Sequence, residues 1–135
     1  MLIGKDYCDY DTCVALREIG CRIQTEWYIH QPSYERGSCY LCPNIPQGTS
    51  VLDECDYIPR LSLYEAQKWL REEKKLFVEV TLGAFDQTYL WEICNTENSD
   101  LITGGFSSYD TYEEALSEGV RASIKILQDE QKENN

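Results

Sequence analysis

Two cysteines, Cys39 and Cys42, form a C-x-x-C motif, the pattern in this chain that most directly suggests chemistry. Two thiolates at that spacing can share a tetrahedral zinc ion or form a reversible disulfide. A structural zinc needs two further ligands, for which Cys55 and either Cys21 or His30 are the candidates, although none of these belongs to a second ligand-pair motif. A thioredoxin-like redox role needs a helix directly after the motif, whereas a proline and a loop follow it here. Zinc ligation, redox chemistry and ordinary free thiols therefore all stay open.

The chain has seven cysteines, an odd number, and its first residues lack the apolar stretch of a secretory signal peptide. No segment approaches the roughly 18 to 20 apolar residues of a membrane span. We therefore expect a cytoplasmic protein whose thiols stay reduced and mostly serve as small buried apolar side chains. The sequence predicts no cofactor, with zinc as the alternative.

Candidate catalytic groups are few. His30 is the only histidine, so any Cys-His or Ser-His pair must use it, and a surface histidine at the end of a strand is the simpler interpretation. Glu79 and Glu92 are expected on neighbouring strands, as a carboxylate pair of the glycosidase type or as ordinary solvent-facing residues. The chain has no glycine-rich nucleotide-binding motif and no G-x-S-x-G motif. We predict no catalytic residue and a protein that is not an enzyme.

Tyrosine is abundant in the first part of the chain. Tyr28, Tyr34, Tyr40 and Tyr57 fall in one region. Tyrosine is favoured at binding surfaces because it offers a large contact area at little cost in side-chain entropy, but it also covers hydrophobic cores. These four residues are therefore either a binding surface or part of the core.

The charge of the chain limits its partners. Twenty-four acidic residues against twelve basic ones leave a formal net charge of -12. Proteins that hold nucleic acid need clustered lysine and arginine, and an acidic surface repels both phosphates and anionic membranes. Direct nucleic-acid binding and membrane association are disfavoured, and a protein partner is expected.

The hydrophobic periodicity predicts three helices and at least four strands. The clearest helix begins at Ser62, which forms a capping box with Glu65. The segment from residue 39 to 42 can pair with the first strand as a hairpin. The predicted helices cover residues 9–19, 62–74 and 110–128, and the predicted strands cover residues 21–30, 76–82, 88–94 and 101–107.

These elements predict an α+β fold over residues 1–135 as a single domain. We expect two layers, in which an antiparallel sheet of three to five strands carries two main helices on one face, in the order α-β-(β)-α-β-β-β-α. Residues 32–60 are expected to form a long irregular loop or hairpin, and residues 129–135 a frayed tail. The expected core includes Trp69, Val78, Val80, Trp91, Leu116 and Ile126.

Four sequence blocks resemble a family of short uncharacterised proteins from gut Bacteroidetes and their phages and prophages. The blocks are TCVALREIGC, SLYEAQKWLREEKKLFVEV, TYLWEI and FSSYDTYEEALSEGV, and the resemblance covers residues 12–31 and 60–127. It implies a phage or mobile-element origin, and no activity, ligand or site residue comes with it.

Three functions are compatible with these patterns. The first is a small acidic, non-enzymatic accessory protein that binds another protein. The second is a mimic of the nucleic-acid backbone that inhibits a nucleic-acid enzyme, which would need a contiguous stripe of carboxylates. The third is a small domain stabilised by zinc at the C-x-x-C motif.

Overall fold

The computed structural model describes residues 6–25, 27–30, 40–42, 57–83, 86–105 and 107–133, with only the backbone described for residues 30 and 40–42. Among these residues the order of elements is α-β-β-β-α-β-β-β-α, so the predicted α+β class is confirmed. The contacts divide the chain into two compact units, Met1–Ser62 and Leu63–Asn135. That both units belong to one domain stays a prediction.

The first unit begins with helix α1 (Tyr10–Glu18), as predicted. The Asp9 side chain caps its first turn by accepting a hydrogen bond from the Thr12 N–H at 2.8 Å. At its end the Cys21 N–H donates to the Leu16 carbonyl at 2.9 Å, and the Gly20 N–H donates to the Arg17 carbonyl at 3.1 Å. Gly20 has a φ of +108°, so the helix ends in a Schellman motif.

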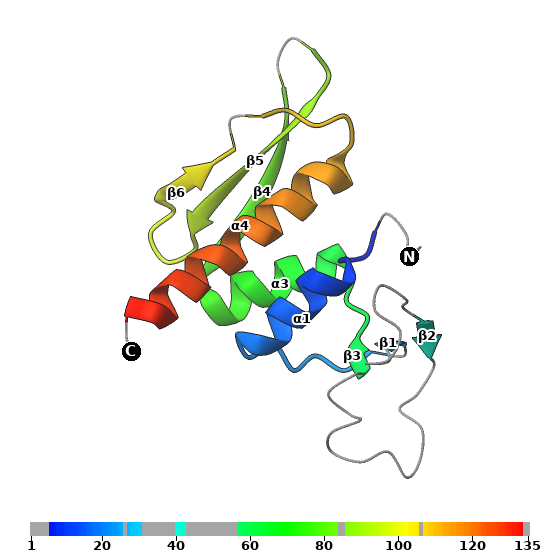
Figure 1. Ribbon diagram of the computed structural model, residues 1–135. Helices are drawn as coiled ribbons and strands as arrows, with labels where there is room; N and C mark the ends of the chain where they lie inside the picture. The colour runs from blue at the N-terminus through cyan, green and yellow to red at the C-terminus, as the bar shows by residue number, and fades with distance from the viewer. Residues whose placement is uncertain are drawn as a thin grey trace. The chain divides into compact units, whose positions relative to one another are not determined.

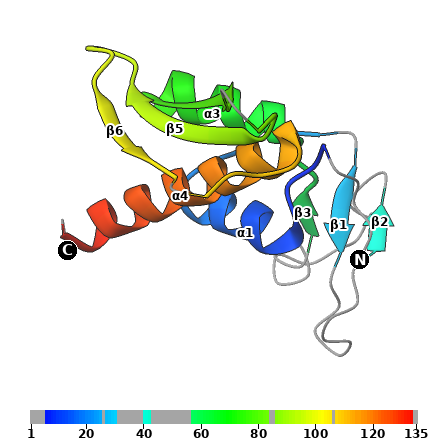
Figure 2. The ribbon, with the colours of Figure 1, turned by 90° about the horizontal axis from the view of Figure 1, so that it is seen from above.

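A small antiparallel sheet completes the first unit. Its strands are β1 (Tyr28–His30), β2 (Tyr40–Cys42) and β3 (Tyr57–Pro59), and Figure 2 shows β1 between the other two. The predicted hairpin partner of the first strand is thus confirmed as β2, whereas β3 was not predicted. The strand expected from residue 21 begins only at Tyr28. The Schellman motif uses the Cys21 N–H to close the preceding helix, so this N–H does not donate to a neighbouring strand.

The second unit consists of helix α3 (Leu63–Lys74), strands β4 (Leu76–Leu82), β5 (Tyr89–Asn95) and β6 (Leu101–Gly104), and helix α4 (Tyr112–Glu133). The three strands form an antiparallel sheet in the order β4-β5-β6. Helix α4 packs against β4 and β5, and α3 packs against β4 and α4 (Figure 1). None of the described helices combines the length and apolar character that crossing a bilayer requires.

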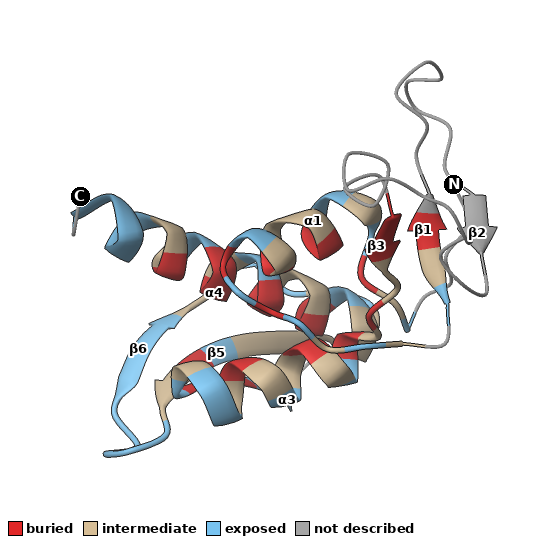
Figure 3. Cartoon of the chain, turned by 90° about the horizontal axis from the view of Figure 1, so that it is seen from below, coloured by how far each residue is buried: buried red, intermediate tan, exposed pale blue. Residues whose placement is uncertain are grey.

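The core of the second unit lies between α4, α3 and the sheet. Val78 and Leu116 are fully buried as expected, whereas four residues predicted in or near the core lie half-buried: Trp69, Val80, Trp91 and Ile126. The buried side of α4 instead consists of Ala115, Leu116, Gly119, Val120, Ser123, Ile124 and Leu127 (Figure 3). The helix also continues past its predicted end at residue 128 to Glu133, since its last residues, Q-K-E, are good helix formers.

A β-bulge and a glycine contact shape the third strand of this sheet. The register of the β5–β6 pairing shifts between Ile93 and Cys94, so Ile102 is the extra residue of a β-bulge. A Cβ added to Gly105 would lie 2.5 Å from Trp91 Nε1, so the backbone at Gly105 packs directly on the indole ring. Glycine is needed here because of this close approach.

Gly119 allows α4 to lie close to the sheet, and its replacement tests this packing. A Cβ added at Gly119 would lie 2.4 Å from Val78 Cγ1. Although alanine is the better helix former, we expect Gly119→Ala to lower the free energy of unfolding by about 1–3 kcal/mol through overpacking. Urea denaturation measures this. Gly104→Ala is the matched control, because its Cβ would lie 3.5 Å from its nearest neighbours, and a Gly119→Ala protein of wild-type stability would show that the crossing is looser than described.

Candidate functional site

Two backbone hydrogen bonds fix which residues of the β4–β5 hairpin face which way. The Gly83 N–H donates to the Thr88 carbonyl at 2.6 Å, and at the other end of the ladder the Thr96 N–H donates to the Lys75 carbonyl at 3.1 Å. Hydrogen-bonded pairs alternate along an antiparallel ladder, so the odd-numbered residues of β4 pair by hydrogen bonds with β5. Their side chains share one face of the sheet, opposite the face on which Val78 meets α4.

We call this second face the outer face, defined by Phe77, Glu79, Glu92 and Cys94. In the register of the hairpin, Phe77 lies directly opposite Cys94, and Glu79 lies directly opposite Glu92. A carboxylate oxygen of each glutamate and the Cys94 Sγ all lie within 4.8 Å of one another. The expected placement of Glu79 and Glu92 on neighbouring strands is therefore confirmed.

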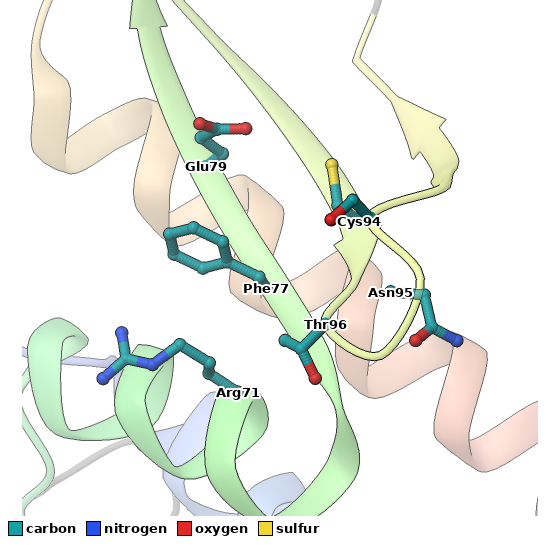
Figure 4. A pocket seen from close by; sticks show the side chains of 7 residues that line it. Arg71, Phe77, Glu79, Cys94, Asn95 and Thr96 are labelled. Atoms are coloured by element: carbon teal, nitrogen blue, oxygen red, sulfur yellow. The ribbon is translucent and has the colours of Figure 1, made fainter.

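A cavity of about 480 Å³ opens beside this cluster. Figure 4 shows its side chains coming from the last turns of α3, from β4 and β5, and from the turn after β5. Its lining residues are Arg71, Phe77, Glu79, Cys94, Asn95, Thr96 and Ser99.

The turn that forms one wall of the cavity is fixed by its own hydrogen bonds. The Asn95 side chain accepts from the Glu97 N–H at 2.8 Å, and the Ser99 N–H donates to the Asn95 carbonyl at 2.8 Å. Ser99 adopts a left-handed φ of 62° to make this turn. The wall is thus held by the backbone and a short polar side chain.

Arg71 forms the opposite wall. Its guanidinium carbon lies 5.7 Å from the centroid of the Phe77 ring, within the range of a cation–π contact. Among the described residues, Arg71 makes no ion pair with Glu79 or Glu92. Arg71 therefore leaves the charge of the glutamate pair unneutralised.

The pKa of the Cys94 thiol reflects both its burial and the negative charge on the outer face. Burial raises the pKa of its thiol above the ordinary value, and the negative charges of Glu79 and Glu92 raise it further. A thiol with a raised pKa stays protonated at neutral pH and is a weak nucleophile. Cys94 therefore contributes a polarisable, uncharged surface to the cavity.

The tyrosines predicted as a binding surface are only partly described. Tyr28 is half-buried, whereas Tyr57 is buried and its carbonyl accepts a hydrogen bond from Arg17 at 3.0 Å, so Tyr57 belongs to the core. Tyr34 lies outside the described residues, and only the backbone of Tyr40 is described, in β2. The binding role of Tyr28, Tyr34 and Tyr40 stays a prediction.

The predicted zinc ligands are likewise divided. Cys39 and Cys55 lie outside the described residues, Cys21 is buried, and the backbones of His30 and Cys42 lie on the paired strands β1 and β2. Zinc ligation at the C-x-x-C motif therefore stays a prediction.

Arg71, Phe77 and Cys94 were not singled out by the sequence. The register of a hairpin follows from its loop, so the position of Cys94 opposite Phe77 and two residues from Glu92 was a readable signal. The position of Arg71 depends on how α3 packs, and no local sequence pattern indicates it.

Comparisons with protein-family models, with curated proteins and with solved structures found no match to this chain. The phage or mobile-element origin stays a prediction.

Removing one charge of the glutamate pair is expected to stabilise the protein. Like charges directly opposite on an antiparallel pair are destabilising, and cross-strand pairs of this kind contribute roughly 0.2–1 kcal/mol. We therefore expect Glu79→Gln or Glu92→Gln to raise the free energy of unfolding by about that amount in low-salt buffer. Glu97→Gln, in the exposed turn, is the control and should change little. If Glu79→Gln and Glu92→Gln both lower the free energy of unfolding, other interactions already offset the repulsion between the two carboxylates.

Alkylation of Cys94 provides a second measurement. At pH 8 the wild-type thiol should react slowly with iodoacetamide, because its raised pKa leaves little thiolate. The double variant Glu79→Gln/Glu92→Gln should react faster, since the two carboxylates that raise the pKa are gone. Peptide mapping by mass spectrometry separates Cys94 from the other cysteines. Equal rates in the two proteins would show that burial alone sets this pKa.

Proposed function

We propose that this protein is a small, non-enzymatic binding module that takes a lysine or arginine side chain of a protein partner on the outer face of the β4–β5–β6 sheet. The observation that carries the proposal is the pair Glu79 and Glu92, which lie side by side next to the cavity. Among the described residues, neither glutamate forms an ion pair with a lysine or an arginine.

A cation bound at this position removes the electrostatic repulsion between the Glu79 and Glu92 carboxylates. Two carboxylates in direct register repel each other, and a single ammonium or guanidinium group between them replaces that repulsion with two charge-assisted hydrogen bonds. The excess of twelve acidic charges in the whole chain also attracts a basic partner and speeds its association.

The surroundings of the glutamates suit a long side chain. The Phe77 ring and the Cys94 thiol lie next to the carboxylates and can pack against the aliphatic stem of a lysine or arginine. Leu101 pairs with Cys94 across to β6 and is 60% exposed, and Ile102 beside it is 43% exposed. Apolar surface thus extends beyond the cavity, which favours a macromolecular partner over a free small ion.

A divalent cation is a weaker candidate for the same place. Glu79, Glu92 and Cys94 have the spacing of a ligand set, but they supply three donors, two of them carboxylates, whereas a structural zinc takes four protein ligands. Mimicry of the nucleic-acid backbone stays a prediction, since no observation on the outer face favours it over a basic protein partner.

A blocked heptapeptide of alternating valine and lysine tests the proposal. We expect binding in low-salt buffer by isothermal titration calorimetry, and loss of at least about tenfold in affinity when norleucine replaces the lysines, because a charge-assisted hydrogen bond contributes roughly 1.5–3 kcal/mol. The variant Glu79→Gln/Glu92→Gln should lose the same affinity.

The matched control separates recognition from general attraction. Glu114→Gln/Glu130→Gln removes the same amount of charge from exposed positions on α4, which packs on the opposite face of the sheet. This control should bind the peptide nearly as well as the wild type. If both double variants weaken binding equally, the peptide responds only to net charge and the proposal is wrong. Retained binding after chelation of metals is also expected.

A further inference from the structure

The side of β4 that is not paired with β5 is an edge of the sheet, and its backbone groups point away from the sheet. Because the odd-numbered residues of β4 bond to β5, the N–H and C=O groups of Val78, Val80 and Leu82 point to the opposite side, where the sheet ends. An edge of this kind is a template for another strand, and proteins usually block it with a charge, a proline or a covering side chain.

Half of this edge is blocked. The Gln67 side chain, from α3, donates a hydrogen bond to the Val78 carbonyl at 2.7 Å and so covers the beginning of the edge. Beyond it, the sequence Val80-Thr81-Leu82 contains neither a charge nor a proline. Within the described part of the chain, the outward N–H and C=O groups of Val80 and Leu82 have no hydrogen-bond partner.

The open half of the edge is accessible. Leu82 is 61% exposed, and Thr81 is exposed. Figure 1 shows the β4–β5 hairpin reaching beyond α3 at this end. We call the stretch Val80–Leu82 the free edge.

We infer that the free edge binds an extended segment of a basic protein partner as an added antiparallel strand. The inference rests on the proposed function and specifies how the partner's cationic side chain reaches Glu79. Residues opposite each other in adjacent strands share a face of the sheet. Partner residues opposite Val80 and Leu82 are therefore apolar, and those opposite Glu79 and Thr81 are basic.

Charge identifies the occupant as a basic segment rather than a second copy of this chain. A second copy would bring another net charge of -12 and a second Glu79 to the same face. A segment of alternating basic and apolar residues instead places its cations on the outer face, next to Glu79, and its apolar side chains on the face that carries Val80 and Leu82. The backbone supplies affinity, and the alternation supplies specificity.

Selective N-methylation of the valine–lysine heptapeptide tests this arrangement. In the inferred register the valines lie opposite Val80 and Leu82, in hydrogen-bonded pairs, so their N–H groups face β4, while the lysine N–H groups face away. N-methylation of the valines should lower the affinity about tenfold or more, because it removes hydrogen bonds and inserts methyl groups against the edge. N-methylation of the lysines should leave the affinity within about twofold.

Amide hydrogen exchange gives a readout on the protein itself. With the unmethylated peptide bound, exchange at the Val80 and Leu82 N–H groups should slow, whereas the Thr81 N–H, already bonded to β5, should change little. Slowing at Thr81 but not at its two neighbours would place the peptide elsewhere and overturn the inference.

The two proposals fail in different ways. If binding depends on Glu79 and Glu92 but both methylated peptides bind equally well, the free edge is not used and only the inference is overturned. If the unmethylated peptide shows no binding that depends on the two glutamates, the proposed function fails and the inference fails with it.

Discussion

In the β4–β5 hairpin, the hydrogen bond from Gly83 to Thr88 decides where every other group of the two strands goes. It sets the phase of the ladder, so that Val78 turns toward α4 while Phe77 and Glu79 turn to the outer face. A shift of one residue would exchange the two faces and place the carboxylates beneath the helix. The core and the candidate site are thus two consequences of one register.

The two sides of the sheet make opposite contributions to stability. On the inner side, Gly119 lets α4 approach until the helix backbone meets Val78, and the buried apolar side chains there stabilise the unit. On the outer side, Glu79 and Glu92 repel each other, and no arginine or lysine of the described residues is paired with them. The inner packing offsets the outer repulsion, which allows the site to keep its charge in the absence of a partner.

The sequence predicted the elements that have a strong period and a clear boundary signal. The capping box at Ser62 located α3, and the alternation around Val78 and Trp91 located the hairpin. Strand β3 was missed because its three residues are too few for a period, and the shift of the α4 core toward Val120 and Leu127 depends on the approach at Gly119. The cavity was missed because Arg71 comes to line it beside Cys94 only through the packing of α3, which no local pattern encodes.

The pairing of Glu79 with Glu92 also has an evolutionary consequence. A chain selected for stability alone gains by replacing either residue, and many single substitutions achieve this without harm to the core. Selection for folding alone therefore does not favour the pair, although a chain with stability to spare can carry it. Loss of either glutamate removes the repulsion and leaves the other neutral for stability. In related chains that do not use the outer face for binding, both positions should then vary while the glycine beneath α4 stays in place.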